Sequence, residues 1–190
     1  MNQVSHEALE QIFLSARTAQ NYLPEPVTPD HLREIWEVAK WGPTSVNSMP
    51  ARIVWCLGQA SRDRLADCAS SSNGAKIRAA PAAAIVGMDL EFHERLPEQA
   101  RSWFAGDDRL IAETALRNSA LQGAYLIIAA RALGFGVGPM SGFDADAVDN
   151  AFFAGTKIRS NFIMTLGRAD PQGFRPRGPR LGFEEATRIE

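Results

Sequence analysis

Cysteine and histidine are scarce in this chain of 190 residues, and their scarcity excludes several kinds of site. The two cysteines, Cys56 and Cys68, form no CxxC pair and no disulfide framework, so we expect two reduced and mostly buried thiols. None of the three histidines has a second histidine at i+4 or a neighbouring cysteine, and this spacing predicts no metal site. The chain also contains no GxSxG nucleophile elbow and no Walker-type phosphate loop.

Net charge and long apolar runs are equally limited. A formal charge of −2 argues against a protein that coats nucleic acid or an anionic membrane. The longest apolar stretch, residues 120–135, is interrupted by Gln122 and Arg131 and falls short of a membrane span. Glu7 and Glu10 lie among the first apolar positions, which is unlike a signal peptide. We therefore expect a cytoplasmic protein with no nucleic-acid or membrane partner.

Arginine is abundant where lysine is not. Only three of the 20 cations are lysine and 17 are arginine. Arginine grips phosphate or carboxylate with two parallel hydrogen bonds, so its distribution bears on ligand binding, although codon usage is an alternative explanation. With 45% hydrophobic residues, the length fits a single globular domain over residues 1–190.

Helical and extended patterns alternate along the chain, which predicts an α/β or α+β fold. Thr28 precedes Pro29 as an N-cap, and the helix that begins there ends before Gly42. The apolar patterns predict further helices over 7–16, 61–69, 109–133 and 144–153, and strands over 52–57, 82–88, 136–139 and 161–166.

Two segments have an unusual composition. Residues 89–108 are acidic and aromatic at once, with Phe92, Trp103 and Phe104, and this mixture predicts an excursion or lid over a site and not core structure. The second half of the 109–133 helix is apolar nearly all round, so we expect it at the centre of the fold or in a dimer interface.

Short polar clusters lie beside the ends of the expected elements. Their hydroxyls, amides and arginines in turn-rich loops suit a polar anionic ligand, but for each cluster taken alone turn chemistry and solvent exposure are the favoured explanation. The clusters are Ala16–Thr18, Trp41–Pro50, Asn73–Lys76, Gly138–Gly142 and the arginine-rich tail.

The order of these clusters resembles the flavin-dependent nitroreductase family. That family has an Arg-Ser pair at the end of its first helix, then a loop of the type Ala-Pro-Ser-x-x-Asn-x-Gln-Pro-Trp, an Asn-x-x-Lys pair, and a loop after the long helix that meets the flavin ring. The corresponding segments are Arg17–Thr18, Gly42–Pro50, Asn73–Lys76 and Pro139–Gly142.

A subfamily resemblance covers nearly the whole chain. The blocks are similar to the malonic semialdehyde reductase (3-hydroxypropanoate dehydrogenase) group of pyrimidine catabolism. They are Trp41–Asn47, Ser48–Arg52, Glu94–Pro97, Arg101–Phe104, Gly138–Asp144 and Phe183–Ala186. The resemblance implies an α+β nitroreductase-like fold, with a central, mostly antiparallel sheet flanked by helices, in an intertwined homodimer.

The resemblance implies that flavin mononucleotide (FMN) is bound with its phosphate near the first helix. Arg17 suits the phosphate through charge-assisted bidentate bonds, and Thr18 adds a hydroxyl. The second cation of the family's opening motif is Gln20 here, so Arg180, with Arg177 as its alternative, would supply the missing charge from the tail.

The same resemblance assigns residues to the ribityl chain and the ring. Ser45 and Asn47 would meet the ribityl or ring edge from the other subunit, and Met49 stands where the family has glutamine. Asn73 and Lys76 would face the pyrimidine end, where a cation stabilises the negative charge of the reduced ring. Simpler explanations are open for each: turn formation for Ser45 and Asn47, and a solvated surface charge for Lys76.

Pro139, Met140 and Ser141 would line the ring, and Arg101 would bind the carboxylate of a substrate. The implied activity is a ping-pong reaction: NADPH or NADH reduces the flavin and leaves, and malonic semialdehyde is then reduced to 3-hydroxypropanoate. The cofactor carries the chemistry, in agreement with the lack of an evident acid–base pair. The alternatives are a generic nitro or quinone reductase and a flavin-binding carrier or sensor without turnover.

Overall fold

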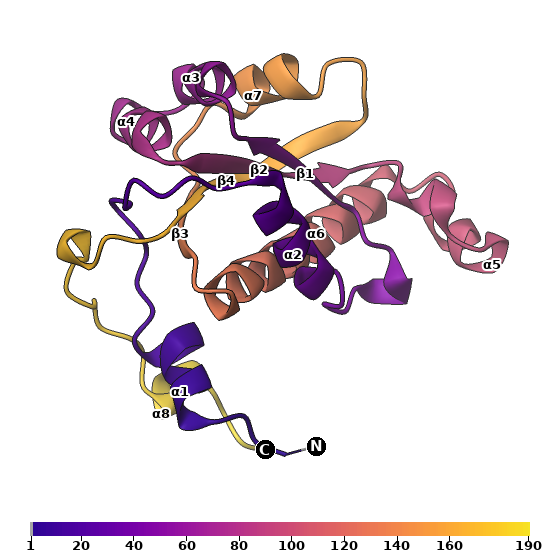
Figure 1. Cartoon of the computed structure of the whole chain (residues 1–190). Helices are drawn as coiled ribbons and strands as arrows, with labels where there is room; N and C mark the ends of the chain where they lie inside the picture. Colours follow the sequence, from indigo (N-terminus) through magenta and orange to yellow (C-terminus); the bar gives the residue numbers. More distant parts are fainter. Residues whose placement is uncertain (1) are drawn as a thin grey trace.

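A four-stranded antiparallel sheet forms the middle layer of the fold (Figure 1). The computed structural model describes residues 2–190. The strand order is β1-β2-β4-β3, so β2 and β4 are central and β1 and β3 are edges. The strands are β1 (Ala51–Cys56), β2 (Ala82–Asp89), β3 (Gly136–Met140) and β4 (Ile158–Gly167).

Helices cover both faces of this sheet. Alternation along β2 sends Ala84 and Val86 into one apolar cluster and Ala83 and Ile85 into another, because successive side chains point to opposite faces. Figure 1 shows the first cluster's helices below the sheet and the second's above it. Below lie α2 (Pro29–Ala39) and α6 (Asp108–Ala132), and above lie α3 (Gln59–Asp67), α4 (Ser71–Ala79) and α7 (Ala145–Phe152).

Most of the expected elements are confirmed within a few residues. The four strands are all present, and the long helix α6 begins one residue before the expected start. The first helix divides into α1 (His6–Leu9) and a π-helical turn, η1 (Glu10–Leu14). The α+β prediction, with an antiparallel sheet between helices, is confirmed.

Helix α4 was not expected, because Ser71, Ser72 and Gly74 are weak helix formers that usually favour loops. Packing overrides this preference. Ile77 is fully buried, and a Cβ on Gly74 would lie only 2.8 Å from the Ala66 carbonyl oxygen, so glycine lets α4 pack closely on α3. Residues 73–76 therefore belong to a helix and not to a turn-rich loop.

Residues 89–108 form a small structured unit with η3 (Phe92–Arg95), α5 (Glu98–Arg101) and η4 (Ser102–Phe104). The expectation that this segment lacks core structure is wrong for two aromatics. Phe92 and Phe104 are buried with their ring centroids 5.1 Å apart, and they pack on the start of α6, whereas Trp103 is exposed. Closure of the segment over a site stays a prediction.

The first helix and the tail after β4 lie side by side, away from the sheet (Figure 1). The tail after β4 contains η5 (Pro171–Gly173) and α8 (Phe183–Ala186) and is exposed. Cys56 is buried and Cys68 half-buried, and both are free thiols. Within residues 2–190, no helix combines the length and apolar character needed to cross a bilayer.

We expect Thr28→Ala to lower the free energy of unfolding by about 1 kcal/mol, the usual cost of losing an N-cap. The Thr28 hydroxyl accepts a hydrogen bond from the His31 amide at 3.3 Å, and the His31 ring accepts one from the Thr28 amide at 3.2 Å. Urea denaturation followed by circular dichroism measures the difference. Thr187→Ala in the exposed tail is the control, and equal midpoints for the two variants would contradict the capping role.

Candidate functional site

Five arginines surround a pocket of about 340 Å³ between the first helix, the end of α6 and the tail. Thr18 lies in the same wall. Within residues 2–190, none of these arginines forms an ion pair with an acidic side chain, so the pocket concentrates uncompensated positive charge. We call this set the arginine pocket: Arg17, Arg131, Arg175, Arg177 and Arg180.

The tail closes the arginine pocket by capping the first helix. The Arg177 guanidinium donates to the carbonyl oxygens of Phe13, Leu14 and Ala16, and the Arg17 guanidinium donates to those of Ser15 and Ala16. Carbonyls at a helix C-terminus have no partner in the helix and attract cations. Arg17 thus acts as a cation at the end of the first helix, and the same side chain also lines the pocket.

Arg131 carries a partly buried charge whose hydrogen bonds are incomplete. It lies in the last turn of α6, and its Nη1 donates to the Ile12 carbonyl at 3.2 Å, but its Nε is buried without a partner. Burial lowers the pKa of Arg131, and the neighbouring Arg177 lowers it further. An anion bound between these guanidiniums would relieve both penalties, because it would supply the missing counter-charge and hydrogen-bond acceptor. The pocket therefore fits a phosphate group.

The chain after Arg17 runs beside the edge strand β3. The Ala19 amide donates to the Val137 carbonyl at 2.9 Å, and the Tyr22 hydroxyl donates to Thr165 Oγ1 at 2.6 Å. Burial raises the pKa of Tyr22 to about 12, so its hydroxyl keeps the proton that it donates. These contacts fix Arg17 and Thr18 at the start of β3.

A second, mainly apolar pocket of about 320 Å³ lies at the other end of β3. Pro139, Met140 and Ser141 line it opposite α6, and an edge strand accommodates Pro139 because one side of its backbone needs no ladder hydrogen bond. Asn73 Nδ2 donates to the Gly142 carbonyl at 3.1 Å. This contact brings helix α4, which carries the half-buried Lys76, to the same loop.

Residues 44–49, which we call the strained loop, carry Ser45 and Asn47. Val46, Asn47 and Met49 have φ values of 48°, 53° and 42°, in the left-handed region that side chains other than glycine rarely adopt. Such strain persists only where neighbouring structure enforces it, and it gathers at functional sites. The Ser45 amide donates to Asn118 Oδ1 on α6 at 2.8 Å, while the Ser45 and Asn47 residues stay exposed.

The strained loop contacts the middle of α6, whereas the arginine pocket lies at the C-terminal end of that helix. Asn118, which holds the loop, precedes Arg131 by 13 residues on the helix. At 1.5 Å per residue, this spacing is about 20 Å along the helix axis. The apolar pocket at β3 is lined by Ala120, Ala124 and Ile127, on the other side of α6 from Asn118. One chain therefore brings the Arg17 region, β3 and α4 together, but it does not bring Ser45 and Asn47 to that group.

Arg101 also lies apart from the other candidates. It is exposed on α5 and lines an open hollow of about 660 Å³ with His93, Glu94 and Glu98. None of the other expected site residues lines that hollow. Across residues 2–190, no cluster of three or more His, Cys, Asp or Glu side chains has the arrangement of a metal site.

Sequence reasoning missed Arg131 and Arg175 as members of the pocket. Arg131 did carry a signal, since it interrupts the longest apolar stretch of the chain. A charged side chain in a helix that is otherwise apolar all round needs a local reason, such as a ligand. Arg175 carried no comparable signal in its polar tail.

Comparison with known proteins identifies the family. The family model described as the nitroreductase family matches residues 13–168, a span that includes Arg17, the strained loop, α4, α6 and the whole sheet. The chain belongs to the nitroreductase family. The resemblance expected from the polar clusters is confirmed at this level.

Full-length relatives agree with this assignment. A candidate NADH dehydrogenase/NAD(P)H nitroreductase of Burkholderia lata is 53% identical over 195 residues and covers 100% of both chains. A protein of the same description from Stenotrophomonas maltophilia K279a is 51% identical over 187 residues and covers 96% of this chain and 95% of its own. Both relatives are named as candidate NAD(P)H nitroreductases, in agreement with the family model.

Solved structures confirm the expected nitroreductase-like fold. A candidate nitroreductase from Exiguobacterium sibiricum, crystallised in complex with FMN, superposes with a TM-score of 0.85 at 19% identity and covers 100% of both chains. A Bacillus subtilis member superposes with a TM-score of 0.84 at 23% identity and covers 98% of this chain and 100% of its own. At these identities, the likeness shows the shared architecture alone.

Proposed function

We propose that this chain is an FMN-dependent NAD(P)H oxidoreductase whose arginine pocket holds the cofactor phosphate. The observation that carries the proposal is the pocket's five guanidiniums without acidic partners, among them Arg131 with a buried and unpartnered Nε. A phosphate accepts bidentate hydrogen bonds from guanidiniums and neutralises their mutual repulsion. The FMN complex of the Exiguobacterium sibiricum relative supports FMN as the source of that phosphate.

The remaining residues fit an extended ligand that follows β3. The phosphate would lie against Arg17, Thr18 and the tail arginines, and the ring would lie in the apolar pocket of Pro139, Met140 and Ser141. Asn73 and Lys76 would then face the polar edge of the ring from α4. Bound FMN would supply the redox chemistry, carrying hydride from NAD(P)H to an acceptor, and the chain's own residues bind and orient it.

A second copy of the chain would complete this site. Ser45 and Asn47 are anchored at Asn118, about 20 Å along α6 from the arginine pocket of their own chain. The apolar pocket is lined from the other side of α6, by Ala120, Ala124 and Ile127, so a single chain does not bring the strained loop to the ring. Large apolar side chains are also exposed on the middle of α6, at Leu116, Leu121 and Tyr125. A homodimer through this face would cover the apolar residues and offer each strained loop to the partner's flavin.

The substrate we propose is malonic semialdehyde, reduced to 3-hydroxypropanoate. The support is the set of sequence blocks shared with that subfamily, and Arg101 would meet the substrate carboxylate. A general nitro or quinone reductase is the second candidate, and the names of the relatives from Burkholderia lata and Stenotrophomonas maltophilia favour it.

We expect protein purified with FMN present to be yellow and to oxidise NAD(P)H faster with malonic semialdehyde than with a panel of nitroaromatics and quinones. Steady-state absorbance at the nicotinamide band measures these rates. Lack of flavin absorbance would refute the proposed function, and lack of a preference for the semialdehyde would favour the general reductase. Prereduced protein that none of these acceptors oxidises rapidly would instead indicate a carrier or sensor.

A further inference from the structure

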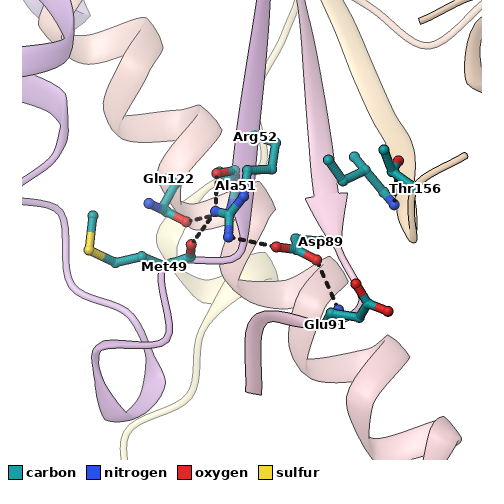
Figure 2. Close-up of polar contacts among 8 residues, drawn as sticks. Met49, Ala51, Arg52, Asp89, Glu91, Gln122 and Thr156 are labelled. Carbon is teal, nitrogen blue, oxygen red and sulfur yellow. Dashed lines mark hydrogen bonds and ion pairs between the residues drawn. The ribbon is translucent and has the colours of Figure 1, made fainter. Parts of the chain in front are cut away.

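An ion pair at the end of the strained loop has no assigned role. Figure 2 shows the Arg52 guanidinium between three oxygens: its Nη1 donates to the Met49 and Ala51 carbonyls at 3.0 and 2.9 Å, and its Nη2 lies 2.6 Å from Asp89 Oδ2. The side chain of Asp89 is 8% exposed and that of Arg52 is 24% exposed, so water screens the pair only weakly. Arg52 thus touches the last residue of the strained loop directly.

The same pair also fastens the segment that follows β2. The second oxygen of Asp89, Oδ1, accepts a hydrogen bond from the Glu91 amide at 2.9 Å (Figure 2). The Asp89 amide donates to the Pro50 carbonyl at 2.9 Å, which ties the two chain segments together through the backbone as well. The Asp89 carboxylate therefore holds the end of the strained loop, through Arg52, and also the beginning of residues 89–108, through the Glu91 amide.

Helix α6 holds the strained loop from its other side. Asn118 Oδ1 accepts from the Ser45 amide and Gln122 Oε1 accepts from the Ala51 amide at 2.9 Å, and the two side chains share one helix face at i and i+4. Met49 lies between these two anchors with φ at 42°. Its carbonyl is held by Arg52, so removal of the guanidinium frees the C-terminal end of the strained loop while the helix anchors remain.

We propose that the Arg52–Asp89 ion pair is a positioning device that keeps the strained loop in the conformation that presents Ser45 and Asn47 to the flavin ring. The inference rests on the proposed function, since it names what holds the ring-contacting loop. Arg52 acts through the Met49 carbonyl and not by touching the ligand. Loss of the pair should therefore weaken contacts to the ring and leave contacts to the phosphate intact.

The test compares the affinities of FMN and riboflavin, which share the ring and differ in the phosphate. We expect Arg52→Met to weaken binding of both ligands by the same factor, about tenfold, and to shift the visible spectrum of the bound flavin. Arg52→Lys keeps the charge beside Asp89 but lacks the planar fork that holds the carbonyls with one nitrogen and Asp89 with the other, so it should restore the binding only in part. Arg109→Met, which breaks an exposed ion pair on α6, is the matched control and should bind both flavins normally.

A double variant separates positioning from simple stability. Arg52→Met alone leaves the Asp89 carboxylate buried without its partner, which lowers the stability of the fold. The additional change Asp89→Asn removes the unpaired charge and its cost. The double variant should therefore regain thermal stability relative to Arg52→Met without regaining flavin affinity or the normal spectrum. Recovery of affinity together with stability would overturn the proposal, as would wild-type riboflavin affinity in Arg52→Met. Failure of the wild type to bind any flavin would instead refute the proposed function itself.

Discussion

Arg17→Ala should weaken FMN binding about 100-fold and leave riboflavin binding unchanged. The guanidinium of Arg17 lines the arginine pocket, and alanine would remove two charge-assisted hydrogen bonds to the phosphate, worth roughly 3 kcal/mol together. Riboflavin lacks that phosphate, so its affinity reports only the ring and ribityl contacts. Titration of flavin fluorescence with protein measures both dissociation constants.

Two further variants test this interpretation, one inside the arginine pocket and one outside it as the negative control. Arg131→Ala should show the same selective loss, because Arg131 lines the pocket from α6. Arg33→Ala removes an exposed guanidinium on α2 that pairs with Asp30, and it should change neither affinity. An equal loss of FMN and riboflavin binding in Arg17→Ala would place the phosphate elsewhere.

Leu121→Asp should convert the protein to a monomer that no longer retains FMN. The Leu121 side chain is 45% exposed on the apolar face of α6, and a carboxylate there would be buried unpaired in the proposed dimer. An unpaired buried charge costs several kcal/mol, so the dissociation constant of the dimer should rise about 1,000-fold or more. Light scattering coupled to size-exclusion chromatography measures the mass, and the flavin absorbance of the same peak measures retention.

Ala60→Asp places the same charge on the exposed surface of α3, in the opposite helical layer, and should leave both the mass and the flavin content unchanged. A Leu121→Asp variant that stays dimeric would rule out this α6 face as the interface. A monomer with full FMN affinity would show that Ser45 and Asn47 of a second chain are not needed.

The sequence predicted the sheet and most helices because these elements have strong local signals. Continuous apolar runs marked β2 and β4, and the Thr28-Pro29 cap marked the start of α2. The sequence did not predict helix α4, because its stability comes from the packing of Gly74 and Ile77 against other elements, which no local pattern encodes. The burial of Phe92 and Phe104 was not predicted for the same reason, since the residues that they pack against lie on α6.

The candidate site was predictable where its residues are close in sequence or follow a family pattern. Arg17 and the tail arginines meet in one pocket, although more than 150 residues separate them. Arg131 could not be assigned without the structure, because only the fold shows that the end of α6 lies against η1. The contacts of Arg52 with Met49 and Asp89 likewise depend on the pairing of β1 with β2.

Helix α6 fixes the distance and the angle between the strained loop and the arginine pocket. It holds the strained loop through Asn118 and Gln122 and faces the arginine pocket through Arg131. Each residue added to or removed from the helix between these positions would turn one end by about 100° relative to the other and shift it by 1.5 Å. A single insertion or deletion between Gln122 and Arg131 would therefore rotate the anchors of the strained loop relative to the arginine pocket, although no side chain that contacts either site would be replaced.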